Sequence, residues 1–310
     1  MSRLAYPFMK YSSPAYVMSR PVVTMNLSMF ISSIKNRLTH ALDKRIVIST
    51  YERLFGRKLH WNNPMRFTEK VQVFKISDEA ERLWPYVDKY EVRSYVKGTI
   101  GSDYLNSVYH VFDHVDEIDE RRLPQSFVLK ATHGSGWNII CPDKNLLDWP
   151  LAKAQLTKWM NMNYYSACGK ERQYKNIKPR IICEKYLTTD EQSLVEYKLM
   201  CFHGTVHYIQ AMKDKLTPQA SSCYYDTHWR PAGFSYTDKK PRPILTIPKP
   251  LHLDEIIRIG QKLAAPFDHV RVDLYNAHGK LHFGELTFTS GNGLNTFTPD
   301  LFDRVLGKLW

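Results

Sequence analysis

The sequence predicts an α+β fold whose sheets are built from antiparallel hairpins. Two stretches of apolar alternation enclose short turns that contain glycine: residues 195–202 and 205–211 flank His203-Gly204, and residues 269–276 and 280–288 flank His278-Gly279. Segments with helical periodicity lie before and between these hairpins, without a strict alternation of single strands and helices. This pattern favours an α+β fold over a doubly wound parallel sheet.

The composition is that of a folded protein with a basic surface. The 310 residues are 43% apolar, 24% charged and 13% aromatic, which is enough apolar material for a sizeable core. The net charge of +12 attracts anions of several classes. Because the basic residues are dispersed, with no arginine-rich arm, zinc-finger spacing or aromatic RNA-binding motif, we expect no nucleic-acid partner.

The cysteines and the apolar runs favour a cytoplasmic location. Five cysteines are widely spaced and form no Cys-x-x-Cys pair, which argues against a disulfide framework or a zinc site. No apolar run is long enough for a membrane-spanning helix. Pro7, Pro14 and Pro21 interrupt the N-terminal stretch, where a signal peptide would need a continuous apolar region.

The N-terminal region begins as a loose tail over residues 1–24 and continues as a helix over residues 25–42. An apolar stripe with helical spacing defines this helix: Leu27, Phe30, Ile31, Ile34, Leu38, Ala41 and Leu42. Lys35, Arg37 and His40 lie off the stripe. Two interpretations stay open, a surface helix that packs on the domain and an interfacial helix that rests on an anionic membrane.

The middle of the chain alternates less regularly between helices and strands. Helical spacing covers residues 45–56, 66–77, 80–97 (with Pro85 limiting the start), 151–163 and 253–265. Strand-like segments cover residues 126–131, 139–141 and 180–187. A glycine-bearing turn at residues 133–138 joins the first two of these strands.

The hairpin of residues 269–288 carries two carboxylates that we expect to lie close together. Side chains alternate along a strand, so Arg271 and Asp273 share a face, as do Glu285 and Thr287 on the returning strand. Two carboxylates on adjacent strands repel each other unless a cation lies between them, and Mg²⁺ takes such oxygen ligands. The alternative is a pair of solvated surface acids.

A possible phosphate-binding segment follows the strand of residues 126–131. Lys130 ends an apolar run, and His133-Gly134-Ser135-Gly136 follows as a small loop whose backbone N–H groups could approach anionic oxygens. The spacing is neither that of a Walker A motif nor that of a dinucleotide fingerprint. The alternative is an ordinary hairpin loop.

A third charged segment ends the buried strand of residues 180–187. Glu184-Lys185 closes the strand. Glu191 follows it, and Glu196 and Lys198 lie in the first strand of the next hairpin. The alternative is a strand that turns polar where it leaves the core.

In their order along the chain, these three segments resemble the ATP-grasp superfamily over residues 84–295. The resemblance implies two lobes with antiparallel sheets that clamp ATP, preceded by a helical N-terminal region. It implies nucleotide contacts from Lys89, Lys130, the loop residues His133, Gly134, Ser135 and Gly136, the hinge residues Glu184, Lys185 and Leu187, and the ribose-binding Glu191. It implies Lys198 and Arg271 as catalytic cations.

The metal site implied by this resemblance consists of Asp273, Glu285 and Thr287. The family's usual motif is Glu-x-Asn, in which the asparagine is a third metal ligand. Here the motif is Glu285-Leu286-Thr287, so a threonine hydroxyl stands where the amide is expected.

The TupA-like branch of that superfamily is the closer resemblance, from about residue 50 to the C-terminus. It rests on Asn63-Pro-x-x-Phe-Thr-Glu-Lys70, His133-Gly-Ser-Gly-Trp-Asn-Ile-Ile140, Gln173-Tyr-Lys-Asn-Ile-Lys-Pro-Arg180, Val270-Arg-Val-Asp-Leu-Tyr275 and Phe283-Gly-Glu-Leu-Thr-Phe288. The resemblance does not cover residues 1–45, which the apolar spacing predicts as a tail and amphipathic helix. It implies residues 46–118 as a helical region, 119–185 as the small lobe and 186–310 as the large lobe.

The activity implied by the resemblance is an ATP- and Mg²⁺-dependent carboxylate–amine ligase of bacterial surface-polysaccharide synthesis. Its partners would be a uronic-acid-containing glycan or its precursor and an amino acid or peptide amine. The interfacial interpretation of residues 25–42 would add an anionic membrane surface, at the inner face of the plasma membrane. A glycosyltransferase is the alternative, although no Asp-x-Asp motif lies between a strand and a turn. A non-enzymatic module held at the membrane by its basic helix would leave the set of charged residues without a function: Lys130, Glu184, Lys198, Asp273 and Glu285.

Overall fold

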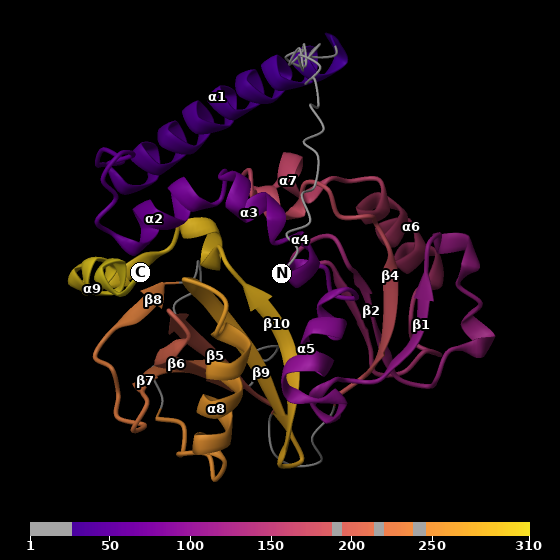
Figure 1. The fold of residues 1–310 in the computed structure, drawn as a ribbon. Helices are drawn as coiled ribbons and strands as arrows, with labels where there is room; N and C mark the ends of the chain where they lie inside the picture. Colours follow the sequence, from indigo (N-terminus) through magenta and orange to yellow (C-terminus); the bar gives the residue numbers. More distant parts are fainter. Residues whose placement is uncertain (1–26, 188–193, 214–219, 238–245) are drawn as a thin grey trace, which may run out of the picture. The chain divides into compact units, whose positions relative to one another are not determined.

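The computed structural model describes residues 27–187, 194–213, 220–237 and 246–310 (Figure 1). The helices are α1 (Leu27–Phe55), α2 (Phe67–Phe74), α3 (Asp78–Arg82), α4 (Trp84–Val87), α5 (Val92–Ile100), α6 (Trp149–Met160), α7 (Tyr164–Ala167), α8 (Leu253–Ala264) and α9 (Leu301–Leu309). The strands are β1 (Val108–Phe112), β2 (Phe127–Ala131), β3 (Asn138–Cys141), β4 (Ile181–Lys185), β5 (Val195–Phe202), β6 (Thr205–Lys213), β7 (Ser221–Asp226), β8 (Ser235–Thr237), β9 (His269–Ala277), β10 (Lys280–Thr287) and β11 (Thr296–Thr298). Short 3₁₀ turns are η1 (Ser102–Tyr104), η2 (Val115–Glu117), η3 (Glu120–Arg122), η4 (Arg172–Tyr174) and η5 (Ser290–Gly293).

The chain forms two compact units, Met1–Ala41 and Leu42–Trp310. The two N-terminal helices expected at residues 25–42 and 45–56 are one continuous helix, α1, because no glycine or proline separates them. Within the described residues, no helix combines the length and the apolar character that a bilayer crossing requires.

The prediction of a single helix over residues 80–97 is wrong, because three short helices share this region. Ser77 caps α3 by accepting a hydrogen bond from the backbone N–H of Ala80 at 3.0 Å. Pro85 opens α4, as expected for a residue without a backbone N–H. The Asp88 carboxylate then accepts from the N–H groups of Tyr90 and Glu91 at 2.7 and 3.2 Å, which forms a turn between α4 and α5.

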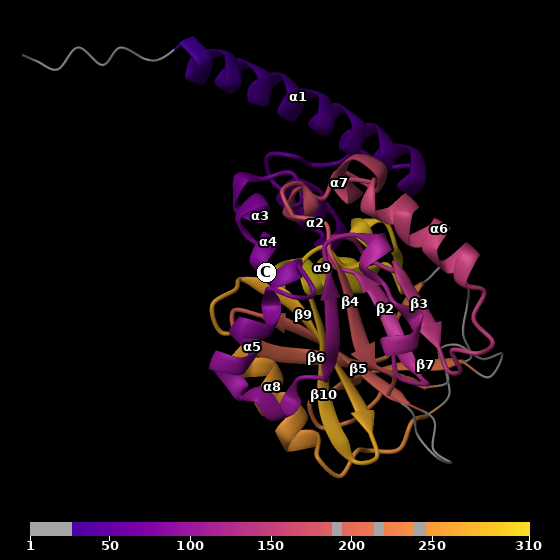
Figure 2. The same cartoon turned by 90° about the vertical axis from the view of Figure 1, so that its right-hand side faces the viewer.

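The first sheet has four antiparallel strands in the order β1-β4-β2-β3. Along β2, Phe127 and Leu129 are fully buried and pack with Leu156 of α6, which covers this face (Figure 2). Val128 and Lys130, which alternate with these residues, therefore point to the opposite face. Strand β1 lies where a helical region was expected, and it occupies the edge of the sheet.

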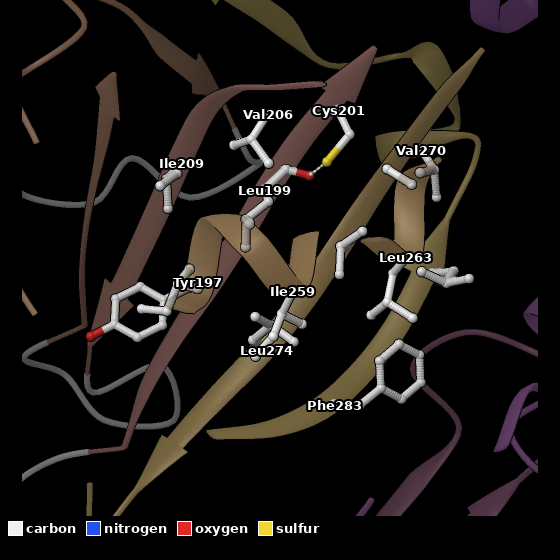
Figure 3. Close-up of a cluster of buried hydrophobic side chains, with 14 of the residues drawn as sticks. Tyr197, Leu199, Cys201, Val206, Ile209, Ile259, Leu263, Val270, Leu274 and Phe283 are labelled. Atoms are coloured by element: carbon white, nitrogen blue, oxygen red, sulfur yellow. Dashed lines mark hydrogen bonds between the residues drawn. The ribbon is translucent and has the colours of Figure 1, made fainter. Parts of the chain in front are cut away.

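The second sheet has five antiparallel strands in the order β10-β9-β5-β6-β7 and packs against α8 (Figure 3). Both hairpins expected from the sequence are confirmed, as β5–β6 and β9–β10. Helix α8 lies so near the sheet at Gly260 that a Cβ atom there would stand 2.4 Å from Leu199 and 3.0 Å from Val206. This contact fixes α8 behind the sheet and leaves the other face of β5, β9 and β10 for polar side chains.

A bulge sets the register of the β9–β10 hairpin. Phe283 pairs with Leu274, but Glu285 pairs with Asp273, so Gly284 is an extra residue on β10. A Cβ atom at Gly284 would lie 3.0 Å from the Asp273 carbonyl oxygen, which explains a residue without a side chain at the bulge. Without this bulge Gly284, and not Glu285, would stand opposite Asp273.

Helix α2 is anchored to the C-terminal helix by a buried carboxylate. Asp303 accepts hydrogen bonds from the backbone N–H of Thr68 at 2.9 Å and from its hydroxyl at 2.7 Å, and it pairs with Arg57 at 3.0 Å. From the other end of α2, Gln72 donates to the carbonyl groups of Asn292 and Gly293, both at 2.8 Å. The turn η5 that follows β10 is thereby held in place.

Candidate active site

A row of charged side chains crosses the three adjacent strands β5, β9 and β10. Lys198 pairs with Asp273 across β5 and β9, and Asp273 pairs with Glu285 across β9 and β10. Residues that pair directly on antiparallel strands point to the same face. The Lys198 ammonium donates to Asp273 and lies 2.8 Å from Glu196 Oε1. The expected approach of Asp273 and Glu285 is confirmed by this register.

Arg271 bridges the two carboxylates. Its Nε lies 2.6 Å from Asp273 Oδ1, and its Nη2 lies 2.8 Å from Asp273 Oδ2 and 3.0 Å from Glu285 Oε1. Nη2 also donates to Thr287 Oγ1 at 3.0 Å, and this hydroxyl donates to Glu285 at 2.9 Å. Oxygens of Asp273, Glu285 and Thr287 therefore converge on one cationic atom.

Burial and mutual charge set the ionisation of this row. Burial raises the pKa of Asp273, and the neighbouring Arg271 and Lys198 counteract that rise. Burial alone would lower the pKa of Arg271, but the adjacent Asp273 and Glu285 raise it above its ordinary value. The pKa of Glu285 is lowered, because Arg271, Lys198 and Lys89 outweigh the effect of burial.

On the first sheet, Lys130 and Glu184 form an ion pair of 2.5 Å. Arg93 from α5 adds a second cation, 3.8 Å from the Glu184 carboxylate. The Lys89 ammonium interacts electrostatically with charged residues of both sheets. Burial lowers the pKa of its ammonium to about 8, Glu285 of the second sheet and Glu184 of the first raise it, and Lys130 lowers it.

The glycine-bearing loop is held by side chains on both of its sides. The Lys89 ammonium donates to the Gly134 carbonyl group, and the His133 ring lies 2.9 Å from the Trp159 carbonyl oxygen. The Trp137 ring folds over Gly134, where a Cβ atom would stand 2.4 Å from it. Ser135 and Gly136 are exposed at the loop tip.

The structure brings together most residues selected from the sequence. Lys198, Arg271, Asp273, Glu285 and Thr287 form one connected row, and Lys130 pairs with Glu184. Lys185 ends β4 with an exposed side chain, Leu187 is half-buried, and Glu191 lies outside the described residues. Across the described parts of the chain, no three His, Cys, Asp or Glu side chains are grouped as metal ligands would be.

Sequence reasoning missed several polar residues beside the row. Arg93 reaches Glu184 from α5, and Glu171 and Thr289 meet near the end of β10. Glu171 lies just before the Gln173–Arg180 motif, which is the only signal that could have selected it.

Two antiparallel sheets from successive parts of the chain, with a charged row on one and a lysine–glutamate pair on the other, make this an ATP-grasp fold. The chain belongs to the TupA-like ATP-grasp family, whose family model matches residues 69–310. Comparison with curated proteins finds no match.

Several solved ligase structures resemble this chain at low sequence identity and low TM-score. An L-amino acid ligase from Bacillus licheniformis has 13% identity and a TM-score of 0.42, covering 74% of this chain and 52% of that one. D-alanine–D-alanine ligase from Helicobacter pylori has 14% identity and a TM-score of 0.40, covering 73% and 61%. The ATP-grasp ligase PsnB, complexed with a minimal precursor, has 10% identity and a TM-score of 0.36, covering 68% and 54%. The chain thus spans little more than half the length of these proteins.

Proposed function

We propose that the protein is an ATP- and Mg²⁺-dependent carboxylate–amine ligase that forms an amide through an acyl phosphate. The observation that carries the proposal is the row Lys198–Asp273–Glu285 with Arg271 bridging its carboxylates. Family membership supports it, because ATP-grasp proteins clamp ATP between two such sheets. Lys89 and Lys130 supply further cations from the other side.

The cations of the site are already paired with carboxylates, so a bound nucleotide would exchange these partners for phosphate oxygens. Lys130 would leave Glu184 for the phosphates, and Lys198 and Arg271 would face the transferring group. A carboxylate of the substrate, already ionised, attacks the γ-phosphate to give an acyl phosphate and ADP. Fixed cations stabilise the charge that spreads over the transferring group, and positioning supplies much of the remaining acceleration.

The donor set at Arg271 Nη2 fits a hard divalent cation. Two carboxylates and a hydroxyl from Asp273, Glu285 and Thr287 converge on a cationic atom at 2.8–3.0 Å. Mg²⁺ is bound in proteins by one or two carboxylates together with substrate phosphates. When bound there, Mg²⁺ would neutralise phosphate charge, and these residues would hold it.

For the substrates, we propose a uronic acid of a bacterial surface polysaccharide, or its precursor, as the carboxylate and an amino acid or peptide as the amine. The support is the family resemblance together with the net charge of +12, which favours acidic substrates. We also propose that the protein works at the cytoplasmic face of the plasma membrane. The exposure of Leu38 and Leu42, one turn apart on α1, supports this placement.

Ligand-dependent melting tests the proposal. ATP with MgCl₂ should raise the melting temperature, and UDP-glucose should not. At an ATP concentration of a hundred times Kd, binding adds about 2.7 kcal/mol to the free energy of unfolding. K130A should weaken the ATP effect. K178A is the matched control, because Lys178 is an exposed lysine paired with Asp113 at 2.7 Å. A shift with UDP-glucose and none with ATP would overturn the ligase proposal.

A further inference from the structure

A second buried polar cluster adjoins the charged row and consists of Glu171, Gln173 and Thr289. The Thr289 hydroxyl donates to the Glu171 carboxylate, and Gln173 Nε2 donates to Thr289 Oγ1 at 2.6 Å. The three residues are 6%, 1% and 3% exposed. Thr289 lies two residues beyond Thr287, and the hydroxyl of its neighbour Ser290 accepts from Arg271 at 3.5 Å. The cluster is therefore linked to the Arg271 guanidinium through Ser290, the residue that follows Thr289.

This cluster has more hydrogen-bond acceptors than donors. Lys75 is the cation that acts on Glu171 electrostatically. Within the described residues, Gln173 Oε1 is buried without a hydrogen-bond partner. The Lys75 ammonium, which faces the cluster from α2, donates instead to Asn292 Oδ1 at 2.7 Å. Buried acceptors left without donors are costly. A ligand that carries several N–H donors and a positive charge would satisfy both oxygens.

Two tyrosines interact electrostatically with both this cluster and the row. The rings of Tyr164 and Tyr174 are 4.7 Å apart, and both residues are influenced by the charges of Glu171 and Glu285. The titratable groups that face Glu171 are Lys75, Tyr164, Cys168 and Tyr174. Burial raises the pKa of Glu171 to about 7, while the Thr289 hydrogen bond and Lys75 lower it.

We propose that Glu171 and Gln173 form the subsite for the amine substrate, in which the Glu171 carboxylate and Gln173 Oε1 accept from its ammonium group and Glu171 takes its proton. This inference rests on the proposed ligase function for its chemical step. The position suits that step, because Glu171 lies next to the row that handles the phosphoryl group and away from the Lys130–Glu184 pair.

The proton balance of the step follows directly. The ammonium group gives one proton to Glu171, and the nitrogen lone pair attacks the carbonyl carbon of the acyl phosphate. A C–N bond forms, the C–O bond to phosphate breaks, and the second proton of the nitrogen leaves with the phosphate. A general base whose pKa lies near the working pH is the most effective one.

A binding experiment tests the subsite without any knowledge of the acid. Ethylammonium chloride should raise the melting temperature of the wild-type protein more than tetramethylammonium chloride does at equal ionic strength, because only ethylammonium has N–H donors. The difference should grow from pH 6 to pH 8 as Glu171 loses its proton. E171Q, which can still accept from Thr289, should abolish the difference. The same response to both salts in the wild type would overturn the subsite.

A kinetic experiment tests the role of Glu171 as a base. With ATP, glucuronate or galacturonate, and a panel of amino acids, E171Q should slow amide formation by about 10²–10⁴-fold. With hydroxylamine, which is largely unprotonated at neutral pH, E171Q should form hydroxamate at close to the wild-type rate. The wild-type rate of amide formation should fall as the pH drops below about 7, and E171Q should lack this limb.

E81Q is the matched control, because Glu81 is a partly buried carboxylate that contacts the same segment through Lys175 at 3.4 Å. It should leave both reactions unchanged. Equal loss of amide and hydroxamate formation in E171Q would overturn the base assignment. Absence of ADP release in the wild type with every acid would instead contradict the ligase proposal, and the ethylammonium experiment would still decide the subsite.

Discussion

Arg271 decides how the two carboxylates of the row interact. Considered alone, Asp273 and Glu285 would repel each other, and removing one charge would relieve the folded protein. With the guanidinium between them and Lys198 beside Asp273, each carboxylate is instead the partner of a cation. Removing the charge of Asp273 would leave buried cations without compensation, which is more costly than the loss of the pair itself.

We therefore predict that D273N and E285Q both abolish most ligase turnover but differ in stability. D273N should cost about 3–5 kcal/mol of unfolding free energy, because Asp273 is fully buried between Arg271 and Lys198. E285Q should cost much less, because the Glu285 side chain is 40% exposed. Urea unfolding of both variants, with ADP release measured in parallel, checks this. Equal stability of D273N and the wild type would show that the row is solvated.

The Thr287 hydroxyl links the same groups, since it accepts from Arg271 and donates to Glu285. T287V keeps the shape and removes both hydrogen bonds, so it should raise the Mg²⁺ concentration needed for half-maximal turnover. T287N, which restores an oxygen ligand, should keep the wild-type requirement. An unchanged Mg²⁺ dependence in T287V would exclude Thr287 from the metal site.

At the scale of elements, the position of α8 determines how well the strands of the row are supported. Its apolar face packs on β5 and β9 (Figure 3). At Gly260 the helix comes so close that a Cβ atom would stand 2.4 Å from the Leu199 side chain. Overpacking at such a contact displaces the helix or the strand, and protein interiors resist both. The cost of a methyl group there outweighs the better helix propensity of alanine.

G260A should therefore destabilise the protein by about 1–3 kcal/mol, because the new methyl group would overlap Leu199. G98A is the matched control within another helix, α5. No atom lies within 4 Å of a Cβ at Gly98, so G98A should add about 0.5–1 kcal/mol through helix propensity. Thermal unfolding of both variants decides the matter. A stabilising G260A would mean that α8 does not lie on the sheet as described.

At the scale of the whole molecule, the relevant feature is the N-terminal unit, for which the sequence left two interpretations. Helix α1 crosses the boundary between the two units, and Asp43, just beyond that boundary, is buried and accepts from the Tyr165 hydroxyl. A chain that begins at Asp43 keeps this contact. The apolar residues Leu27, Phe30, Ile31 and Ile34 precede it, and their side chains lie outside the described ones.

A chain beginning at Asp43 should lose binding to phosphatidylserine vesicles and keep the melting temperature of the full chain. Basic residues near the helix attract an anionic surface, and the apolar residues insert into it. Neutral phosphatidylcholine vesicles are the control, and the full chain should bind them weakly. Aggregation or a lower melting temperature of the shortened chain would show that the apolar stripe packs on the protein.

The sequence alone determined the features that depend on neighbouring residues. Alternation and glycine turns predicted both hairpins of the second sheet, and the order of charged segments indicated the row residues. Such patterns depend only on neighbouring residues, so they can be recognised without knowledge of the rest of the fold. Pro85 was recognised as a limit, but Asp88, whose carboxylate closes the turn between α4 and α5, was not.

Only the tertiary structure decided the features that depend on distant partners. Strand β1 is a short edge strand whose side chains are mostly half-buried or exposed. It forms a strand because it pairs with β4, more than 60 residues later along the chain. The bulge at Gly284 that sets Glu285 opposite Asp273 appears only when the two strands pair. Arg271 bridges both carboxylates, and Thr289 contacts Glu171. Long-range packing and charge compensation bring these residues together, so their spacing in the sequence carries no periodic signal.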